Sequence, residues 1–437
     1  MLFYLILDKL KLNKKEASRQ TPRRALFKTQ KGRMSSYKDE IITPGDRLSR
    51  FAHEICVGSY RNCPAVRIIP RQPGNFRGQV DFNWERNVLQ TMLDDDSMTQ
   101  TAQNDGAGGK PQFFTLVGTD EVFYNLGWEI LEMCLEDVVR GGGYPAVMLN
   151  EANFKRITEG NYHLAEAMFR GYGEALAQAH VVNLTGEVAI MKFSITAFCD
   201  TGDDDQLVLT WGGSCLGLNH KDKVIDGSLI EPGMYLVGLL ENGYRCNGGT
   251  FFTNLLMHSC PANISRSDAV KFWRNRFGGF IGRLVVPSKN YSNTVTRIHG
   301  WNQDGTVSQS LAKILGISHI TGGGIWGKLG EIFPPGVGAN LDTMPHPPQV
   351  LLEGQDMSMG TPFQMDDWTA YETTHGGVGM VLVCRDQEAV ETIAREARKD
   401  GVSAVLIGRT TKSDCREIII ESRFREGRSL SSEEKKR

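Results

Sequence analysis

The spacing of apolar residues predicts alternating helices and strands along most of the chain. Apolar side chains recur at helical spacing over residues 128–140 and again over 162–180. The second of these segments is followed directly by an apolar run at 181–184, which is typical of a buried strand. Shorter apolar runs at 113–118 and 234–240 predict two further strands.

The C-terminal part of the chain has the sharpest boundary signals. An apolar run at 377–384 predicts a strand, and Asp386 is a suitable N-cap for a helix that runs to Lys399. Gly401 supplies the expected stop, and a strand is predicted at 403–407.

Three stretches have the composition of long loops: residues 75–112, 192–206 and 340–368. The first contains the run Asn104-Asp-Gly-Ala-Gly-Gly109, and the last is rich in proline, methionine and aspartate. Loops of this length are uncommon in compact domains unless they serve a function or move.

The pattern divides the chain into two halves of similar size, with a break near residues 220–227. Residues 9–33 hold ten lysines or arginines and one acid, so residues 1–35 are expected to form a disordered basic extension. The two halves then correspond to residues 36–222 and 223–420. Residues 421–437 are expected to form a charged, solvated tail.

Composition narrows the class of protein. The formal net charge of −2 gives no overall basic field for nucleic acid or anionic lipid, so neither is expected as a partner. The apolar run at residues 1–7 is too short to span a membrane. The nine cysteines are odd in number and contain no Cys-x-x-Cys pair, which favours a reducing cytoplasm over a disulfide framework or a structural zinc site.

Polar and glycine-rich clusters adjoin the predicted strands. Carboxylates at strand ends are suitable ligands for Mg²⁺ on a nucleotide, and glycine turns that lead into helices point N–H groups at anions. The clusters are Thr119-Asp120, Glu136-Asp137 with Gly141–Pro145, Thr185-Gly-Glu187, Glu241–Gly248 and His319–Gly324.

The order of these clusters resembles that of the phosphoribosylformylglycinamidine cyclo-ligase (AIR synthetase) family, over roughly residues 36–420. Val117-Gly-Thr-Asp120 is similar to the start of the family loop Gly-Thr-Asp-Gly-Val-Gly-Thr-Lys. Met133-Cys-Leu-Glu-Asp-Val-Val139 resembles Met-Cys-Val-Asn-Asp-Leu-Val, and Thr185–Met191 resembles Gly-Gly-Glu-Thr-Ala-Glu-Met. Asn242–Gly248 resembles Ser-Gly-x-His-Ser-Asn-Gly, and Ser318–Gly324 matches His-Leu-Thr-Gly-Gly-Gly.

The chain also departs from the family pattern. In this alignment Glu121-Val-Phe-Tyr-Asn125 replaces the two glycines and the lysine of the family loop, and the interval from Asp120 to Asp137 is about a dozen residues short. Glu136 replaces an asparagine, Ile190 a glutamate, and Arg245 a histidine.

The resemblance implies an α+β fold of two domains, an N-terminal ATP-binding domain that dimerises through its sheet and a C-terminal mixed αβ domain. It implies a homodimeric, cytoplasmic ligase of purine biosynthesis that uses ATP and Mg²⁺ to convert formylglycinamidine ribonucleotide to aminoimidazole ribonucleotide. The implied metal ligands are Asp120, Asp137 and Glu187, and the implied catalytic residues are Asp137, Glu187 and Arg245. The implied nucleotide contacts are Asp120, Asp137, Asn247, Thr321, Gly322, Gly323 and Gly324.

Two alternatives to this ligase remain open: another substrate within the same fold, and a protein without catalytic activity. Selenophosphate synthetase, thiamine monophosphate kinase and the carbamoyl dehydratase of hydrogenase maturation share the architecture, so fold alone does not select the substrate. The second alternative is a catalytically inactive scaffold protein, because the lysine and glycines are missing after Asp120.

Overall fold

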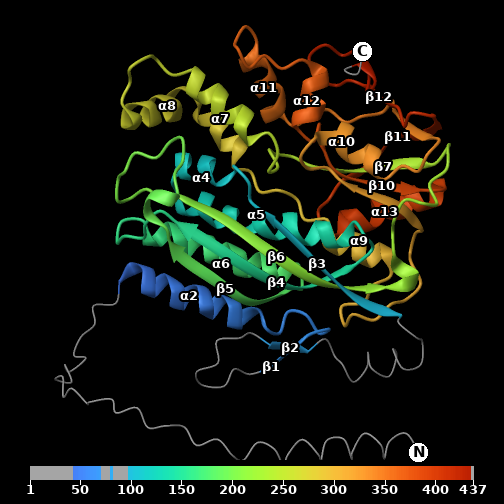
Figure 1. Ribbon diagram of the computed structural model, residues 1–437, viewed down its shortest axis with the longest axis horizontal. Coiled ribbons are helices and arrows are strands. Elements are labelled where there is room, and N and C mark those ends of the chain that lie inside the picture. The colour runs from blue at the N-terminus through green and yellow to red at the C-terminus, as the bar shows by residue number, and fades with distance from the viewer. Residues whose placement is uncertain (1–42, 70–78, 82–96, 435–437) are drawn as a thin grey trace, which may run out of the picture. The chain divides into compact units, whose positions relative to one another are not determined.

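The computed structural model describes residues 43–69, 79–81 and 97–434, which belong to one compact unit that begins at Thr43 (Figure 1). The expected basic extension, residues 1–35, lies outside the described residues. Two sheets organise the described chain. A four-stranded sheet is built from residues before 221, and a seven-stranded sheet from residues after 234.

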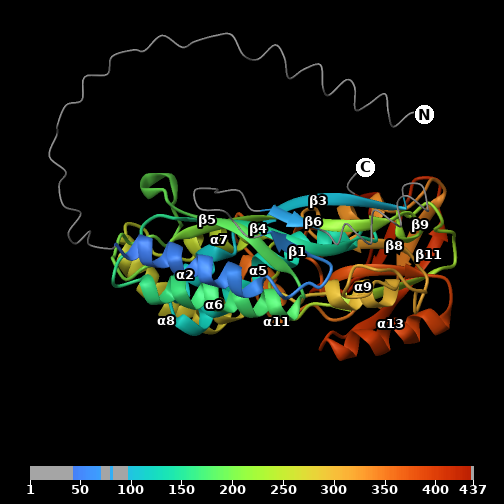
Figure 2. The same ribbon diagram turned by 90° about the horizontal axis from the view of Figure 1, so that it is seen from below.

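The first sheet has the strand order β3-β6-β4-β5. Strands β4 and β5 run parallel and are connected by helix α6, whereas β3–β6 and β6–β4 are antiparallel. Helices α2, α5 and α6 pack on one face of this sheet (Figure 2). The elements are α2 (Pro44–Ser59), β3 (Met98–Gly106), α4 (Pro111–Val117), α5 (Asp120–Val139), β4 (Tyr144–Phe154), α6 (Tyr162–Gln178), β5 (Val182–Ile190) and β6 (Leu209–His220), with a separate hairpin of β1 (Arg67–Ile69) and β2 (Gln79–Asp81).

The second sheet has the order β13-β12-β9-β11-β7-β10-β8 and is antiparallel except at β12–β9. Alternate residues of its central strands enter two different cores, Leu236 on one face and Val237 on the other. The elements are β7 (Tyr235–Leu240), α7 (Gly249–His258), α8 (Arg266–Leu284), α9 (Ser292–His299), β8 (Ile314–His319), α10 (Gly324–Glu331), β9 (Val337–Leu341), α11 (Gln349–Ser358), α12 (Asp367–Thr373), β10 (Val378–Cys384), α13 (Gln387–Lys399), β11 (Ala404–Lys412), β12 (Ile418–Glu421) and β13 (Ser429–Ser431).

Most of the expected elements are confirmed. Helices α5 and α6 cover the two predicted helical segments except for their last one or two residues, and β7, β10 and β11 coincide with predicted strands. The Asp386 side chain accepts a hydrogen bond from the Ala389 N–H and so caps α13, and Gly401 adopts a positive φ of 68° just after it.

Four expectations about local structure are wrong. The predicted strand at 113–118 is helix α4, since Pro111 starts it, Gly118 ends it in the left-handed region, and its apolar run is buried all round. The expected loops at 75–112 and 340–368 contain strand β3 and helix α11. Thr185–Glu187 lies inside β5 rather than after it, because β5 continues to pair with β4 as far as Ile190.

The fourth correction concerns the end of the chain. Residues 421–434 do not form a solvated tail, because β13 pairs with β12 and the apolar side chains of Phe424 and Leu430 are buried. The Asp367 carboxylate also accepts hydrogen bonds from the backbone N–H groups of Glu426 and Gly427. Strand pairing, two buried apolar side chains and the Asp367 hydrogen bonds together hold the segment against the fold.

The crossing of α5 and α6 generates a stability prediction. A Cβ atom on Gly171 would lie 1.9 Å from the Tyr124 carbonyl oxygen, so the helices can approach this closely only with glycine here. Gly171→Ala should lower the free energy of unfolding by about 1–3 kcal/mol or more. Gly282→Ala is the matched control, since its Cβ would have no atom within 4 Å in α8 and helix propensity favours alanine. Urea unfolding of both variants checks this, and equal stabilities would contradict it.

Candidate functional site

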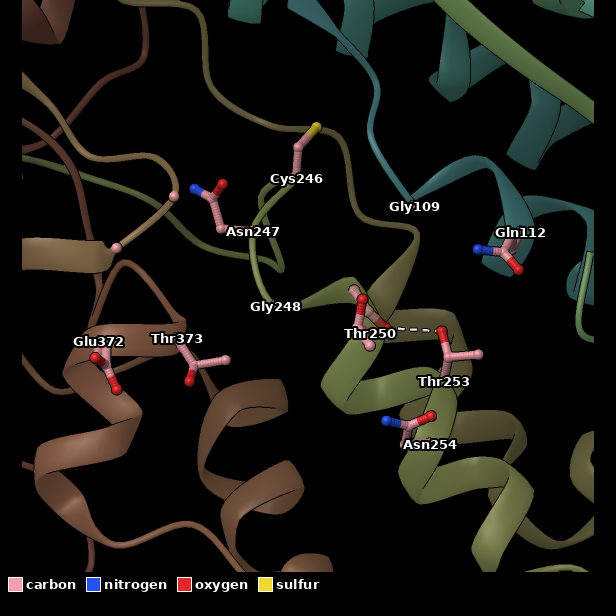
Figure 3. A pocket seen from close by; sticks show the side chains of 13 residues that line it. Gly109, Gln112, Cys246, Asn247, Gly248, Thr250, Thr253, Asn254, Glu372 and Thr373 are labelled. Atoms are coloured by element: carbon pink, nitrogen blue, oxygen red, sulfur yellow. Dashed lines mark hydrogen bonds between the residues drawn. The ribbon is translucent and has the colours of Figure 1, made fainter. Parts of the chain in front are cut away.

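A pocket of about 410 Å³ lies where the starts of helices α7 and α10 come together (Figure 3). Gly248 and Gly323 are the N-caps of these helices, and both adopt the left-handed conformation, with φ of 86° and 89°. Only glycine adopts this conformation at little cost, so the glycine clusters of the sequence are what allow each loop to turn into its helix. The lining residues are Gly109, Gln112, Cys246–Thr250, Thr253, Asn254, Gly322, Gly323, Glu372 and Thr373.

The pocket is suited to a phosphate group. The first N–H groups of a helix have no partner within the helix, and the helix dipole is positive at this end. Two helices of ten and eight residues direct these ends at one cavity, which is the recurrent arrangement for anion binding. The Asn247 side chain joins the two loops, because its Nδ2 donates to the Ile320 carbonyl oxygen.

Five of the expected nucleotide contacts therefore lie in one region. Asn247, Gly322 and Gly323 line the pocket directly, and Gly324 donates its N–H to the Thr321 carbonyl oxygen in the turn beside it. That these residues bind a nucleotide remains a prediction.

The loop between β3 and α4 contains a motif that the sequence alignment missed. Asp105-Gly-Ala-Gly-Gly-Lys110 has the Asp, Gly, Gly and Lys spacing of the family loop Asp-Gly-Val-Gly-Thr-Lys. It begins in the last two residues of strand β3 and ends directly before helix α4, and Gly109 lines the pocket. When Asp105 is aligned with the aspartate of the family loop, the interval to Asp137 is no longer short, because Asp105 lies 32 positions before Asp137. The glycine-rich run at 106–109 is the sequence signal for this loop. A strand at 113–118 would instead place the family loop after that strand, at Asp120.

Asp120 is accordingly not part of this loop. It begins helix α5 directly after the N-cap Thr119, and its side chain is 60% exposed beside His163. Asp120 and Asp137 are separated by about 25 Å along one straight helix at ~1.5 Å per residue. The expected metal site of Asp120, Asp137 and Glu187 is therefore wrong.

Glu187 belongs to strand β5, whereas Asp120 and Asp137 belong to helix α5. It lies on an exposed face of the four-stranded sheet, in register with Glu151 of the neighbouring strand. Within the ranges that the structure describes, no group of three or more His, Cys, Asp or Glu side chains is arranged to hold a metal ion. The catalytic and metal roles expected of Glu187 are not supported by this position.

Asp137 lies at the C-terminal end of α5 and remains partly exposed. Its Oδ1 is 3.1 Å from Nδ1 of His319 and 3.5 Å from Nε of Arg140. Burial by itself would raise the pKa of Asp137, but the hydrogen bond from His319 and the positive charges of Arg140 and Lys328 hold it below its usual value. The carboxylate is thus ionised and oriented.

Asp105 brings a second carboxylate close to the first. Burial raises the pKa of Asp105, a hydrogen bond from the Gly106 N–H opposes this, and the negative charge of Asp137 raises it further. A carboxylate whose proton affinity is raised by the charge of a neighbouring carboxylate is suited to share a cation with it. Mg²⁺ on a nucleotide needs only one or two protein carboxylates, so this pair fits such an ion.

Arg245 is buried in a cluster of carboxylates. Its Nη1 donates to Oε2 of Glu241 at 2.9 Å, and its Nη2 lies 2.5 Å from Oε2 of Glu136 and 3.2 Å from Nε2 of His319. The side chain has no exposed surface, so it is not positioned to contact a substrate. The expected catalytic role of Arg245 therefore does not fit the structure.

Lys110 is buried as well. Its Nζ lies 2.7 Å from Oε1 of Glu129 and also donates to the Val286 carbonyl oxygen and the Ser288 hydroxyl. Nearby, both oxygens of Glu132 are buried and have no hydrogen-bond partner, and burial raises the pKa of Glu132 well above its usual value. Glu129, Glu132 and Glu136 all face this interior from one side of α5.

Comparison with known proteins identifies both halves of the chain. Residues 87–217 match the N-terminal domain of AIR synthase related proteins, and residues 306–420 match the C-terminal domain. Among the residues that the structure describes, no helix is long and apolar enough to cross a membrane.

Similar proteins named phosphoribosylformylglycinamidine cyclo-ligase occur in several bacteria. The protein of Nitrosococcus oceani is 25% identical over 70% of this chain and 75% of its own length. That of Bacillus pumilus is 24% identical, with coverages of 71% and 80%, and that of Sorangium cellulosum is 26% identical, with coverages of 70% and 78%.

Among solved structures, the thiamine-monophosphate kinase of Stenotrophomonas maltophilia K279a aligns with a TM-score of 0.49 at 12% identity, over 84% of this chain and 93% of that one. The hydrogenase maturation protein HypE of E. coli aligns with a TM-score of 0.49 at 12% identity, over 88% and 96% of the two chains. Since both family models match in the expected order and the α+β architecture is as the resemblance implied, this chain belongs to the AIR synthase related family as a divergent member.

Proposed function

We propose that the protein is an ATP- and Mg²⁺-dependent cyclo-ligase that converts formylglycinamidine ribonucleotide to aminoimidazole ribonucleotide. The observation that carries the proposal is the junction of three segments: the Asp105–Lys110 loop, the loop ending at Gly248 and the turn after His319. With the C-terminal end of α5, which carries Asp137, they bring two carboxylates and two helix N-termini into one region. Relatives with this name support the choice of reaction.

The carboxylates and the pocket have separate tasks in this proposal. Asp105 and Asp137 would hold Mg²⁺ on the ATP phosphates, because both contacts of Asp137 use Oδ1 and leave Oδ2 for a cation. The starts of α7 and α10 would bind a phosphate of the substrate or the nucleotide. When bound, Mg-ATP would supply a phosphoryl group that converts the formyl amide oxygen of the substrate into a leaving group. The protein's part is positioning and charge neutralisation.

An inactive scaffold loses part of its support. That alternative depended on the missing lysine and glycines, and Asp105-Gly-Ala-Gly-Gly-Lys110 supplies the glycines, whereas its lysine is buried against Glu129. The direct test is to incubate the purified protein with Mg-ATP and formylglycinamidine ribonucleotide and to assay for ADP and aminoimidazole ribonucleotide. ADP production with a different acceptor only, or no turnover at all, would contradict the proposed reaction.

Asp137→Asn tests the carboxylate pair. The change removes an anionic oxygen but keeps the shape, so the increase in melting temperature caused by Mg-ATP should shrink markedly and turnover should fall by at least about tenfold. Without nucleotide the variant should lose about 1 kcal/mol or less, since the amide oxygen still accepts from His319.

Asp120→Asn is the matched control for this substitution, because it makes the same change on the same helix at an exposed site. It should leave the thermal shift with Mg-ATP and the turnover unchanged. If Asp137→Asn retains the full Mg-ATP stabilisation, Asp137 does not hold the metal.

Thr250→Glu tests the pocket. Thr250 is exposed in the first turn of α7 and lines the pocket, so a carboxylate here would repel a bound phosphate. The dipole at the helix start favours a glutamate, so folding stability should be unchanged or slightly higher. Binding of the phosphate-bearing ligands, measured by titration calorimetry, should weaken by about tenfold, or ~1.4 kcal/mol. Thr250→Gln has a similar shape without the charge and should bind nearly as the parent does.

We also propose that the protein is a cytoplasmic homodimer that pairs through its four-stranded sheet. Alternate residues towards one end of β4 and β6 are half-buried or, at Glu151 and Thr210, exposed on the sheet face opposite α5 and α6. Symmetric dimers are the commonest assembly of soluble proteins. Light scattering at micromolar concentration should give twice the chain mass of 48.6 kDa, and a monomeric mass would contradict the proposal.

A further inference from the structure

Two departures from the family sequence pattern meet in the interior. Glu136 stands where the family has asparagine, and Arg245 where it has histidine. In the fold their side chains form an ion pair with Nη2 of Arg245 2.5 Å from Oε2 of Glu136, and neither side chain is exposed. A charged pair in place of a neutral one is costly to bury, so it calls for a structural or functional reason.

The third member of this contact is His319. Its Nε2 lies 3.2 Å from Nη2 of Arg245 and 3.2 Å from Oε2 of Glu136, while its Nδ1 lies 3.1 Å from Oδ1 of Asp137. The imidazole therefore bridges the buried ion pair and the partly exposed carboxylate at the proposed metal site. It is fully buried, and Nη2 of Arg245, which can only donate, lies within hydrogen-bond distance of Nε2, so a proton on both ring nitrogens does not fit this contact.

A neutral imidazole carries one proton, on either Nε2 or Nδ1. If the proton were on Nε2, it would point at Glu136, and Nδ1 would direct a lone pair at the Asp137 carboxylate. If it is on Nδ1, it donates to Asp137, and Nε2 accepts from a neighbouring donor. The choice therefore decides whether His319 holds the Asp137 carboxylate or repels it.

We infer that Arg245 is a positioning residue that fixes the Nδ1–H form of His319 and thereby orients Asp137. An arginine side chain has only N–H donors and no acceptor, so an Nη2 hydrogen directed at Nε2 is compatible only with an unprotonated Nε2. The guanidinium is itself held in place, because Nη1 donates to Glu241 and to the Lys289 carbonyl oxygen.

The surrounding groups support this orientation from every side. From α5, Glu136 anchors Nη2 of Arg245 and also accepts from the Tyr291 N–H, and Arg140 contacts Asp137. From α10, the charge of Lys328 acts on Asp137. Arg245 thus acts through His319, and the inference depends on the proposed function only for the task of Asp137.

The test is the protonation site of His319, read from side-chain nitrogen NMR of the ¹⁵N-histidine-labelled full chain. His319→Gln serves only to assign the signal. The parent protein should show neutral His319 with the proton on Nδ1. A proton on Nε2 in the parent would overturn the inference without the need for any variant.

Two substitutions then separate Arg245 from its partner. In Arg245→Met the proton should move to Nε2, where Glu136 accepts it, and the KM for Mg-ATP should rise several-fold. In Glu136→Gln, Arg245 still donates to Nε2, so the Nδ1–H form should persist. An unchanged tautomer in folded Arg245→Met would contradict the inference, and so would a tautomer that changes in Glu136→Gln.

Arg245→Met leaves buried carboxylates unpaired, so circular dichroism must show that this variant is folded. If it does not fold, the NMR spectra of the parent and of Glu136→Gln still decide which nitrogen of His319 carries the proton. The NMR result is independent of turnover. A parent protein with Nδ1–H that fails to form aminoimidazole ribonucleotide would refute the proposed reaction and leave the positioning role of Arg245 intact.

Discussion

The site depends on one constraint: charged side chains are buried between α5 and the second half of the chain, and each of them needs a partner there. Glu129 and Glu136 are carboxylates with no exposed surface, and each is stable there only because a cation and backbone N–H groups meet it. The partners come from remote parts of the sequence: Lys110 precedes α4, Arg245 follows β7, and residues 288–291 precede α9. Satisfying two buried charges therefore fixes the position of three loops against one helix.

Those loops are also the ones that form the candidate site. The segment that carries Arg245 continues to Gly248 and the start of α7, and the segment that carries Lys110 contains Asp105 and Gly109. The site's polar groups are thus held by backbone that is already anchored by buried charges. Such anchoring keeps a binding site in its productive geometry before a ligand arrives, which reduces the free-energy cost of binding.

Charge is distributed unevenly over this region. In the interior, Lys110 and Arg245 are matched by Glu129, Glu136 and Glu241, and burial favours the neutral form of Glu132. Toward the pocket, the positive features are helix N-termini rather than side chains. Dipoles and N–H groups attract a phosphate without the long, flexible side chains that binding would have to immobilise.

The apolar pattern determined α5, α6 and α13, because a 3.6-residue repeat follows from burying one face, and short apolar runs located β7, β10 and β11. The glycine-rich clusters of the sequence located the turns at Gly248 and Gly323. The apolar pattern could not determine α4, whose short apolar run is buried all round and has no periodic signal, and that error moved the family loop from Asp105–Lys110 to Asp120. Only the tertiary structure decided which carboxylates meet, since Asp105 and Asp137 come together through sheet and helix packing, whereas Asp120 and Asp137 are held apart by the rigid length of one helix. Likewise, Glu136 and Arg245 are unrelated departures in the sequence and become a pair only because the fold buries both charges against each other.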